Sequence, residues 1–135
     1  MNQHLKTFVK PLIEEMNAFI HDEEHSSWAP LENMTEKPGL YQIYARDGGP
    51  IYVGGGNNLK SCLLRDFKKG NVENSQFRKA LNQTFDFKSE EEITKHITDN
   101  YRYQFEIIED HRERMKLKHF IIAILVPFLN INLEN

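Results

Sequence analysis

The fold is decided by residues 38–67, which have the sequence PGLYQIYARDGGPIYVGGGNNLKSCLLRDF. Strand-forming residues at 42–45 are followed by the turn sequence DGG at 47–49 and by PIYV at 50–53. This pattern predicts a β-hairpin. Pro50 is expected at the start of the second strand, because proline cannot donate a hydrogen bond within a ladder.

Other segments predict helices and one further strand. Asn57 or Asn58 is expected to cap a helix that carries Leu59, Leu63, Leu64 and Phe67. The remaining elements are an amphipathic helix over 4–24 that begins or kinks at Pro11, a linker over 26–37 anchored by Trp28, a helix from Ser75 to about Asn82, a helix from Ser89 to about Asn100, a strand over 101–107 and a last helix from about His111 to Leu125. We therefore expect an α+β (layered α/β) fold, with a small three-stranded antiparallel sheet flanked by helices.

The hairpin carries two tripeptides, Gly39-Leu40-Tyr41 and Tyr52-Val53-Gly54, and Asn58-Leu59 follows them. Near the chain's end, residues 117–123 (LKHFIIA) precede Pro127 and Asn130. In order and spacing, these motifs resemble the signature of the GIY-YIG nuclease family. The resemblance covers about residues 38–130 and implies a GIY-YIG-like domain over 30–135. An extra N-terminal helix and linker over 1–29 precede it. We expect this helix either to cover an exposed part of the core or to form a dimer interface.

The chain departs from the family where the chemistry should lie. The resemblance places Cys62 at the position of the catalytic arginine, Asp66 at that of a frequent histidine and Lys118 at that of the metal-binding glutamate. An ammonium group has no lone pair for Mg²⁺ and repels the ion. The loss of a transition-state cation costs roughly 2.7–4 kcal/mol. The resemblance thus implies a nuclease fold without the usual nuclease chemistry.

Two tyrosines stay at the signature positions. The resemblance places Tyr41 and Tyr52 on adjacent strands near a cleft, where one could transfer a proton, although strand tyrosines also serve core packing. Arg65, three residues beyond Cys62, could reach back and supply the missing positive charge. Cys62 itself is either a reactive thiol or, as we favour, a half-buried filler. Lys118 either binds a phosphate directly or pairs with a nearby carboxylate.

Charge is distributed unevenly along the chain, whose formal net charge is −3. Residues 1–36 carry two basic and seven acidic side chains, whereas residues 57–80 carry six basic and two acidic ones. The basic set, a candidate nucleic-acid surface or an ordinary solvated helix face, comprises Lys60, Arg65, Lys68, Lys69, Arg78 and Lys79.

Composition limits the class of protein. A chain of 135 residues with 39% hydrophobic and 27% charged residues predicts one globular domain. No apolar run is long enough for a membrane span, no secretory signal pattern is present, and one cysteine suits a reducing compartment, so we expect the cytoplasm and no membrane partner.

Metal binding has little support in the sequence. His21 and His25 lie four residues apart, as in zinc sites, but no third ligand is evident, and a solvated helix end is the better interpretation. We expect no cofactor, and Mg²⁺ or Mn²⁺ only if the protein is an active nuclease.

Three functions are compatible with this pattern. The first is a catalytically impaired or inactive GIY-YIG-fold protein that binds DNA or a nucleoprotein partner in a regulatory or competitor role. The second is an active, metal-dependent DNA endonuclease with a rearranged centre. The third is a protein–protein module, such as an inhibitor or immunity-like subunit. The oligomeric state is not determined by the sequence.

Overall fold

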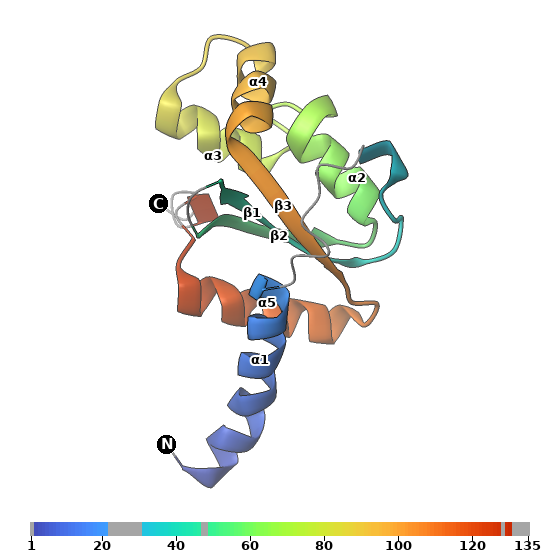
Figure 1. Cartoon of the computed structure of the whole chain (residues 1–135), viewed down its shortest axis with the longest axis vertical. Coiled ribbons are helices and arrows are strands. Elements are labelled where there is room, and N and C mark those ends of the chain that lie inside the picture. Colours follow the sequence, from blue (N-terminus) through green and yellow to red (C-terminus); the bar gives the residue numbers. More distant parts are fainter. Residues whose placement is uncertain (1, 22–30, 47–48, 128, 131–135) are drawn as a thin grey trace.

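The computed structural model describes residues 2–21, 31–46, 49–127 and 129–130 (Figure 1). The side chains of His21, His25 and Trp28 lie outside this part of the chain, as does the predicted boundary between residues 29 and 30.

The centre of the fold is a three-stranded sheet with strand order β2-β1-β3. Its strands are β1 (Gly39–Ala45), β2 (Pro50–Gly56) and β3 (Tyr101–Ile107), and both pairings are antiparallel. The predicted hairpin is confirmed. Pro50 is the first residue of the edge strand β2, a position at which a residue without an N–H group is tolerated. An irregularity after Ile43 places Tyr44 opposite Pro50.

The helices begin close to where the sequence predicts. They are α1 (Gln3–His21), the 3₁₀ turn η2 (Leu31–Asn33), α2 (Leu59–Leu64), the π-helical turn η3 (Arg65–Lys69), α3 (Gln76–Phe85), α4 (Glu90–Asn100) and α5 (His111–Leu125). The predicted caps are confirmed, since the side chains of Asn58, Ser75 and Ser89 each accept a backbone hydrogen bond from the third residue after them. Helix α3 runs past the predicted end at Asn82 and stops where Asp86 adopts a left-handed conformation, φ 55°.

The sheet separates two hydrophobic clusters. Figure 1 shows α2, α3 and α4 on one side of the strands and α5 and α1 on the other. Successive strand residues point to opposite faces, so Tyr41 and Ile43 join the cluster with α2, α3 and α4. Leu40 and Val53 join the second cluster, which includes Leu117 of α5 and the last turns of α1. The predicted layered α+β architecture is therefore confirmed.

Helix α1 covers the core only at its C-terminal end. Met16 and Phe19 are buried in the second cluster, whereas Leu5, Phe8 and Ile13 are between 41% and 58% exposed. The N-terminal half projects away from the body of the molecule (Figure 1). The helix begins at Gln3 and not at Pro11, because its exposed surface lets water satisfy the carbonyl that a proline N–H group would otherwise bond.

The chain after α5 returns to the free edge of β2. The side-chain oxygen of Asn130 accepts a hydrogen bond from Val53 N at 2.8 Å, and its nitrogen donates to Val53 O at 3.0 Å. One amide thus satisfies both backbone groups of an edge residue, and this explains the Pro-x-x-Asn exit noted in the sequence.

Glycine at position 54 is required by a close approach between β1 and β2. Tyr41 lies opposite Gly54, and a Cβ atom at Gly54 would lie 2.5 Å from the Tyr41 ring and hydroxyl. The Tyr41 ring therefore occupies the space that any larger residue would need.

We predict that Gly54→Ala destabilises the protein by about 1–3 kcal/mol, the range for overpacking a tight core. Gly49→Ala is the matched control, because a Cβ atom there meets no atom within 4 Å. Urea unfolding followed by circular dichroism measures both variants. Equal unfolding free energies for the two would contradict the close packing of Tyr41 on Gly54.

Candidate functional site

A cleft of about 290 Å³ lies at the edge of the sheet on the side of α2 and α3. We call it the tyrosine cleft, and its lining consists of Tyr41, Tyr52, Gly54, Gly55, Arg65, Asn74, Gln76 and Lys118. The structure therefore brings together four of the residues predicted from the sequence: both tyrosines, Arg65 and Lys118. A liquid water occupies roughly 30 Å³, so the cleft has room for several waters or a small anionic group.

Asp66 is the centre of the hydrogen bonds beneath the cleft. Its carboxylate is fully buried and accepts hydrogen bonds from Tyr41 Oη, from Ser75 Oγ at 2.7 Å and from Arg65 Nε at 3.1 Å. Sequence reasoning treated Asp66 only as a departure from the family pattern. A carboxylate within a helix of otherwise apolar buried residues was the signal that could have revealed its role.

The π-helical turn η3 positions these groups. Gly70 N donates to Arg65 O at 2.9 Å, which is the five-residue spacing of a π turn. This wider turn accommodates both Asp66 and Phe67 as buried residues, while Arg65 stays about 39% exposed at the cleft. Arg65 lines the cleft, and it is close enough to Cys62 to lower the pKa of the thiol, but its predicted role as a replacement cation stays a prediction.

Both signature tyrosines are held in the protonated form. Burial, the Asp66 carboxylate and Tyr52 together raise the pKa of Tyr41 well above its ordinary value. Burial and Asp66 likewise raise the pKa of Tyr52 strongly, against a smaller opposite effect of Arg65. A tyrosine with a raised pKa keeps its proton near neutral pH, and a neutral phenol is a weak base. Tyr41 and Tyr52 can therefore donate hydrogen bonds but do not readily remove a proton.

Cys62 is a buried residue in contact with β2. A Cβ atom at Gly56 would lie 2.7 Å from Cys62 Sγ, and the cysteine is 8% exposed. Burial raises the pKa of the thiol, which outweighs the lowering effect of Arg65. A protonated, enclosed thiol favours the interpretation of Cys62 as a filler over that of a nucleophile.

Lys118 projects from α5 to the edge of the sheet. It lines the tyrosine cleft although α5 covers the opposite face, because Gly54, Gly55 and Gly56 carry no side chains at the end of β2. Burial lowers the pKa of Lys118, and neighbouring Arg65 adds to the effect. Among the described residues, no carboxylate lies within 4.0 Å of its ammonium group. The alternative that Lys118 pairs with a nearby carboxylate therefore gains no support.

These residues do not fit a catalytic divalent cation. Mg²⁺ needs oxygen ligands, whereas the cleft presents a lysine and an arginine and has no carboxylate in its lining. Asp66 already accepts three hydrogen bonds beneath the surface. Glu113 of α5 forms an ion pair with Lys116 at 3.3 Å. In the described part of the chain, no group of three acidic, histidine or cysteine residues could hold a metal.

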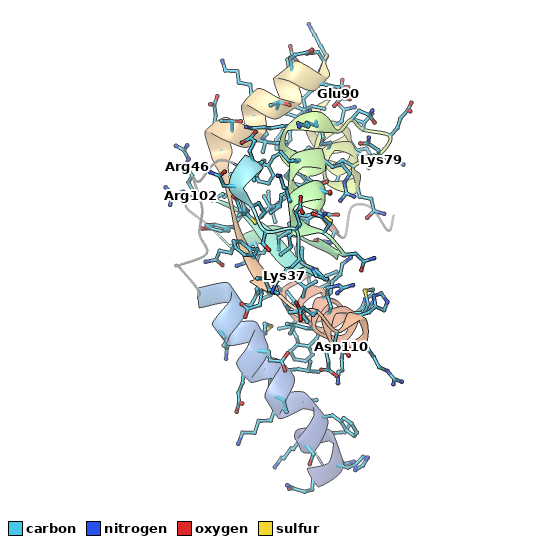
Figure 2. All side chains as sticks on the ribbon, turned by 90° about the vertical axis from the view of Figure 1, so that its right-hand side faces the viewer. Lys37, Arg46, Lys79, Glu90, Arg102 and Asp110 are labelled. Carbon is cyan, nitrogen blue, oxygen red and sulfur yellow. The ribbon has the colours of Figure 1, made fainter. Side chains whose placement is uncertain are left out.

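The predicted basic surface is smaller than the sequence implied. Arg78 has no exposed surface: it bonds Glu90 Oε1 at 3.1 Å and also donates to the backbone oxygens of Asp66 and Glu90. The prediction that Arg78 contacts nucleic acid is wrong, because this guanidinium joins α3 to α4 and η3. Lys79 is exposed on α3 (Figure 2). Lys69 is exposed on η3, Lys60 is partly exposed, and Lys68 bonds Glu32 at 3.3 Å.

The known proteins that this chain resembles are a UvrC protein and an N-terminal domain of UvrC. The chain is 47% identical over 38 residues to the UvrABC system protein C of Saccharophagus degradans, a match that covers 28% of this chain and 6% of that protein. The GIY-YIG N-terminal endonuclease domain of UvrC from Thermotoga maritima, bound to magnesium, is similar with a TM-score of 0.44 and 19% identity, covering 73% of this chain and 89% of that one. A tyrosine-to-phenylalanine variant of the same domain, bound to its catalytic divalent cation, gives a TM-score of 0.45 and 20% identity over 73% of this chain and 88% of that one. No family model matches the sequence.

The fold is GIY-YIG-like. The resemblance predicted from the two tripeptides is confirmed, and the strand pairing places Tyr41 of the first tripeptide opposite Gly54 of the second. The sheet has three strands in the order β2-β1-β3, and both signature tyrosines line the cleft. None of the helices in the described residues is both long and apolar enough to cross a bilayer.

We predict different effects for the two signature tyrosines. Tyr41→Phe removes a hydrogen bond to a buried carboxylate and should destabilise the protein by roughly 1.5–3 kcal/mol. Tyr52→Phe should cost less than about 1 kcal/mol, because within the described residues the Tyr52 ring makes contacts with Tyr41 and Phe77 but its hydroxyl makes no hydrogen bond. Chemical denaturation of the two variants provides the comparison. A larger loss of unfolding free energy for Tyr52→Phe than for Tyr41→Phe would contradict a stabilising hydrogen bond between Tyr41 and Asp66.

Proposed function

We propose that this protein is a catalytically impaired GIY-YIG-fold protein that binds DNA, free or in a nucleoprotein, and acts as a competitor or regulator and not as a nuclease. The observation that supports this proposal most strongly is Lys118, a half-buried cation in the tyrosine cleft with no acidic partner among the described residues. A phosphate group supplies the negative charge that such a cation lacks.

The electrostatics of the cleft favour binding over cleavage. Lys118 and Arg65 contribute positive charge, and Tyr52 contributes a neutral hydroxyl donor whose pKa is raised by burial. These groups can hold a phosphodiester in place by hydrogen bonds and charge. They provide no general base near neutral pH and no ligand set for a metal, so a bound phosphodiester is not activated for hydrolysis.

A second function, a protein–protein module, is favoured by one observation. Three large apolar side chains of α1, those of Leu5, Phe8 and Ile13, are exposed on a helix that projects from the body. Several large apolar side chains exposed on one projecting helix are compatible with a contact site for another protein. A protein that bound a discrete protein partner and no nucleic acid would support this alternative.

We predict salt-dependent binding of a short DNA duplex by the full chain in the absence of divalent cations. Fluorescence anisotropy at 50 mM and 200 mM salt measures the affinity, which should fall as counter-ions compete for the phosphates. Lys118→Ala should weaken binding about tenfold at low salt, since a hydrogen bond to a charged group contributes roughly 1.5 kcal/mol or more. Lys95→Ala, an exposed lysine on α4, is the control and should have little effect.

The same samples are incubated with supercoiled plasmid and Mg²⁺ or Mn²⁺. The native chain should leave the plasmid intact, and the double substitution Cys62→Arg with Lys118→Glu should produce metal-dependent nicking. Two results would overturn the proposal: no DNA binding even at 50 mM salt, or nicking by the native chain that Tyr52→Phe abolishes. The second result would favour an active endonuclease with a rearranged centre.

A further inference from the structure

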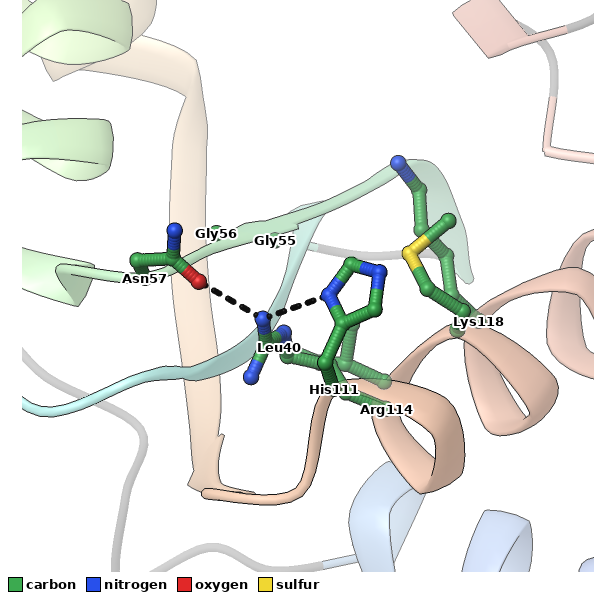
Figure 3. A pocket seen from close by; sticks show the side chains of 8 residues that line it. Leu40, Gly55, Gly56, Asn57, His111, Arg114 and Lys118 are labelled. Carbon is green, nitrogen blue, oxygen red and sulfur yellow. Dashed lines mark hydrogen bonds between the residues drawn. The ribbon is translucent and has the colours of Figure 1, made fainter.

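A second cavity, of about 190 Å³, lies beside the tyrosine cleft on the α5 side of β2. We call it the α5 pocket. Its lining comprises Leu40, Gly55, Gly56, Asn57, His111, Arg114, Met115 and Lys118 (Figure 3). Gly55 and Lys118 line both cavities, so this glycine and the lysine form the boundary between them. Pockets for drug-sized ligands have roughly 300–1,000 Å³, so the α5 pocket suits a single small group.

Three basic side chains of α5 face the pocket. His111, Arg114 and Lys118 are separated by three and four residues and therefore share one face of the helix. Arg114 is only 3% exposed, and its guanidinium donates to Ile108 O at 3.0 Å, to Asn57 Oδ1 at 2.8 Å and to His111 Nδ1 at 3.1 Å. All three acceptors are uncharged groups.

Within the described ranges, Arg114 lacks the acidic partner that a second buried arginine, Arg78, possesses. Arg78 is equally enclosed, but it forms an ion pair with Glu90 at 3.1 Å. Among the described residues, no carboxylate lies within 4.0 Å of the Arg114 guanidinium or the Lys118 ammonium group. Burying a charge without a counter-ion is costly. Two such cations beside one cavity indicate that an anion completes the site.

The hydrogen bonds of His111 also suit an anion. Arg114 is always a donor, so His111 Nδ1 must accept, and a neutral His111 then carries its proton on Nε2. Nε2–H is thus a donor that the Arg114 contact does not use. In Figure 3 the imidazole lies between the Arg114 guanidinium and the Lys118 side chain.

We propose that the α5 pocket is a second phosphate-binding subsite, formed by His111, Arg114 and Lys118 and adjoining the tyrosine cleft through Lys118. It rests on the proposed function, because the shared lysine would contact two neighbouring phosphates of one strand. A free phosphate ion or a terminal phosphate offers the same chemistry, and the experiment below distinguishes these sources.

Inorganic phosphate is titrated into the ¹⁵N-labelled full chain, and amide and arginine side-chain signals are followed by NMR. We expect saturable shifts of the Gly56 and Asn57 amides and of the Arg114 Nε–H signal. His111→Ala should weaken this binding at least threefold. Lys116→Ala should leave it unchanged, because Lys116 is exposed and pairs with Glu113. Arg114→Gln, with its melting temperature measured in parallel, should abolish the shifts in a folded protein.

The DNA-binding assay then identifies the source of the phosphate. If a strand occupies both subsites, His111→Ala lowers DNA affinity as well as phosphate affinity. If a free or terminal phosphate is bound, His111→Ala weakens phosphate binding alone. Phosphate shifts confined to the tyrosine cleft, or no shifts at all, would overturn the subsite while leaving DNA binding through Lys118 intact. Saturation of the α5 pocket in a protein that does not bind DNA would instead contradict the proposed function.

Discussion

The arrangement of the site depends on one buried carboxylate, that of Asp66. It has no exposed surface, and it accepts hydrogen bonds from β1 through Tyr41, from the cap of α3 through Ser75 and from Arg65 beside it. A carboxylate without such donors would be expensive to remove from water. These three bonds therefore tie the central strand, the π turn and the start of α3 into one unit. The same bonds hold a tyrosine and an arginine at the cleft.

The positive charge at the sheet edge comes from two basic side chains that have no acidic partner in the described parts of the chain. Asp66 compensates Arg65 and Glu90 compensates Arg78, whereas Lys118 and Arg114 have no acidic partner within 4.0 Å in the described parts of the chain. The glycines at the end of β2 let Lys118 reach both sides of the strand. The resemblance to the GIY-YIG family implies that Lys118 stands at the position of the metal-binding glutamate. The proposed phosphate binding rests on this exchange of a negative for a positive charge.

Local sequence signals predicted most of the elements. Caps such as Asn58 and Ser75 act over three residues, and alternation in residues 101–107 identifies a strand, so both are visible in the sequence. The apolar neighbours of Asp66 could have indicated that its carboxylate is buried, but not which group it binds, because Tyr41 lies 25 residues away and meets it only in the folded chain. Arg78 was misassigned for the same reason. A basic residue near lysines is expected to be exposed, whereas the folded chain encloses Arg78 and pairs it with Glu90, twelve residues further on. The apolar stripe of α1 predicted a helix but not that half of it stays uncovered.

We propose that the ammonium group of Lys118 occupies the place of a divalent cation in the tyrosine cleft. Isothermal titration of the full chain with Mn²⁺ tests it most directly, with Lys118→Glu titrated under the same conditions. We expect no stoichiometric Mn²⁺ binding by the native chain and a measurable site in the Lys118→Glu variant. One Mn²⁺ bound per native chain, with broadening of NMR signals from Tyr52 and Gly55, would contradict it.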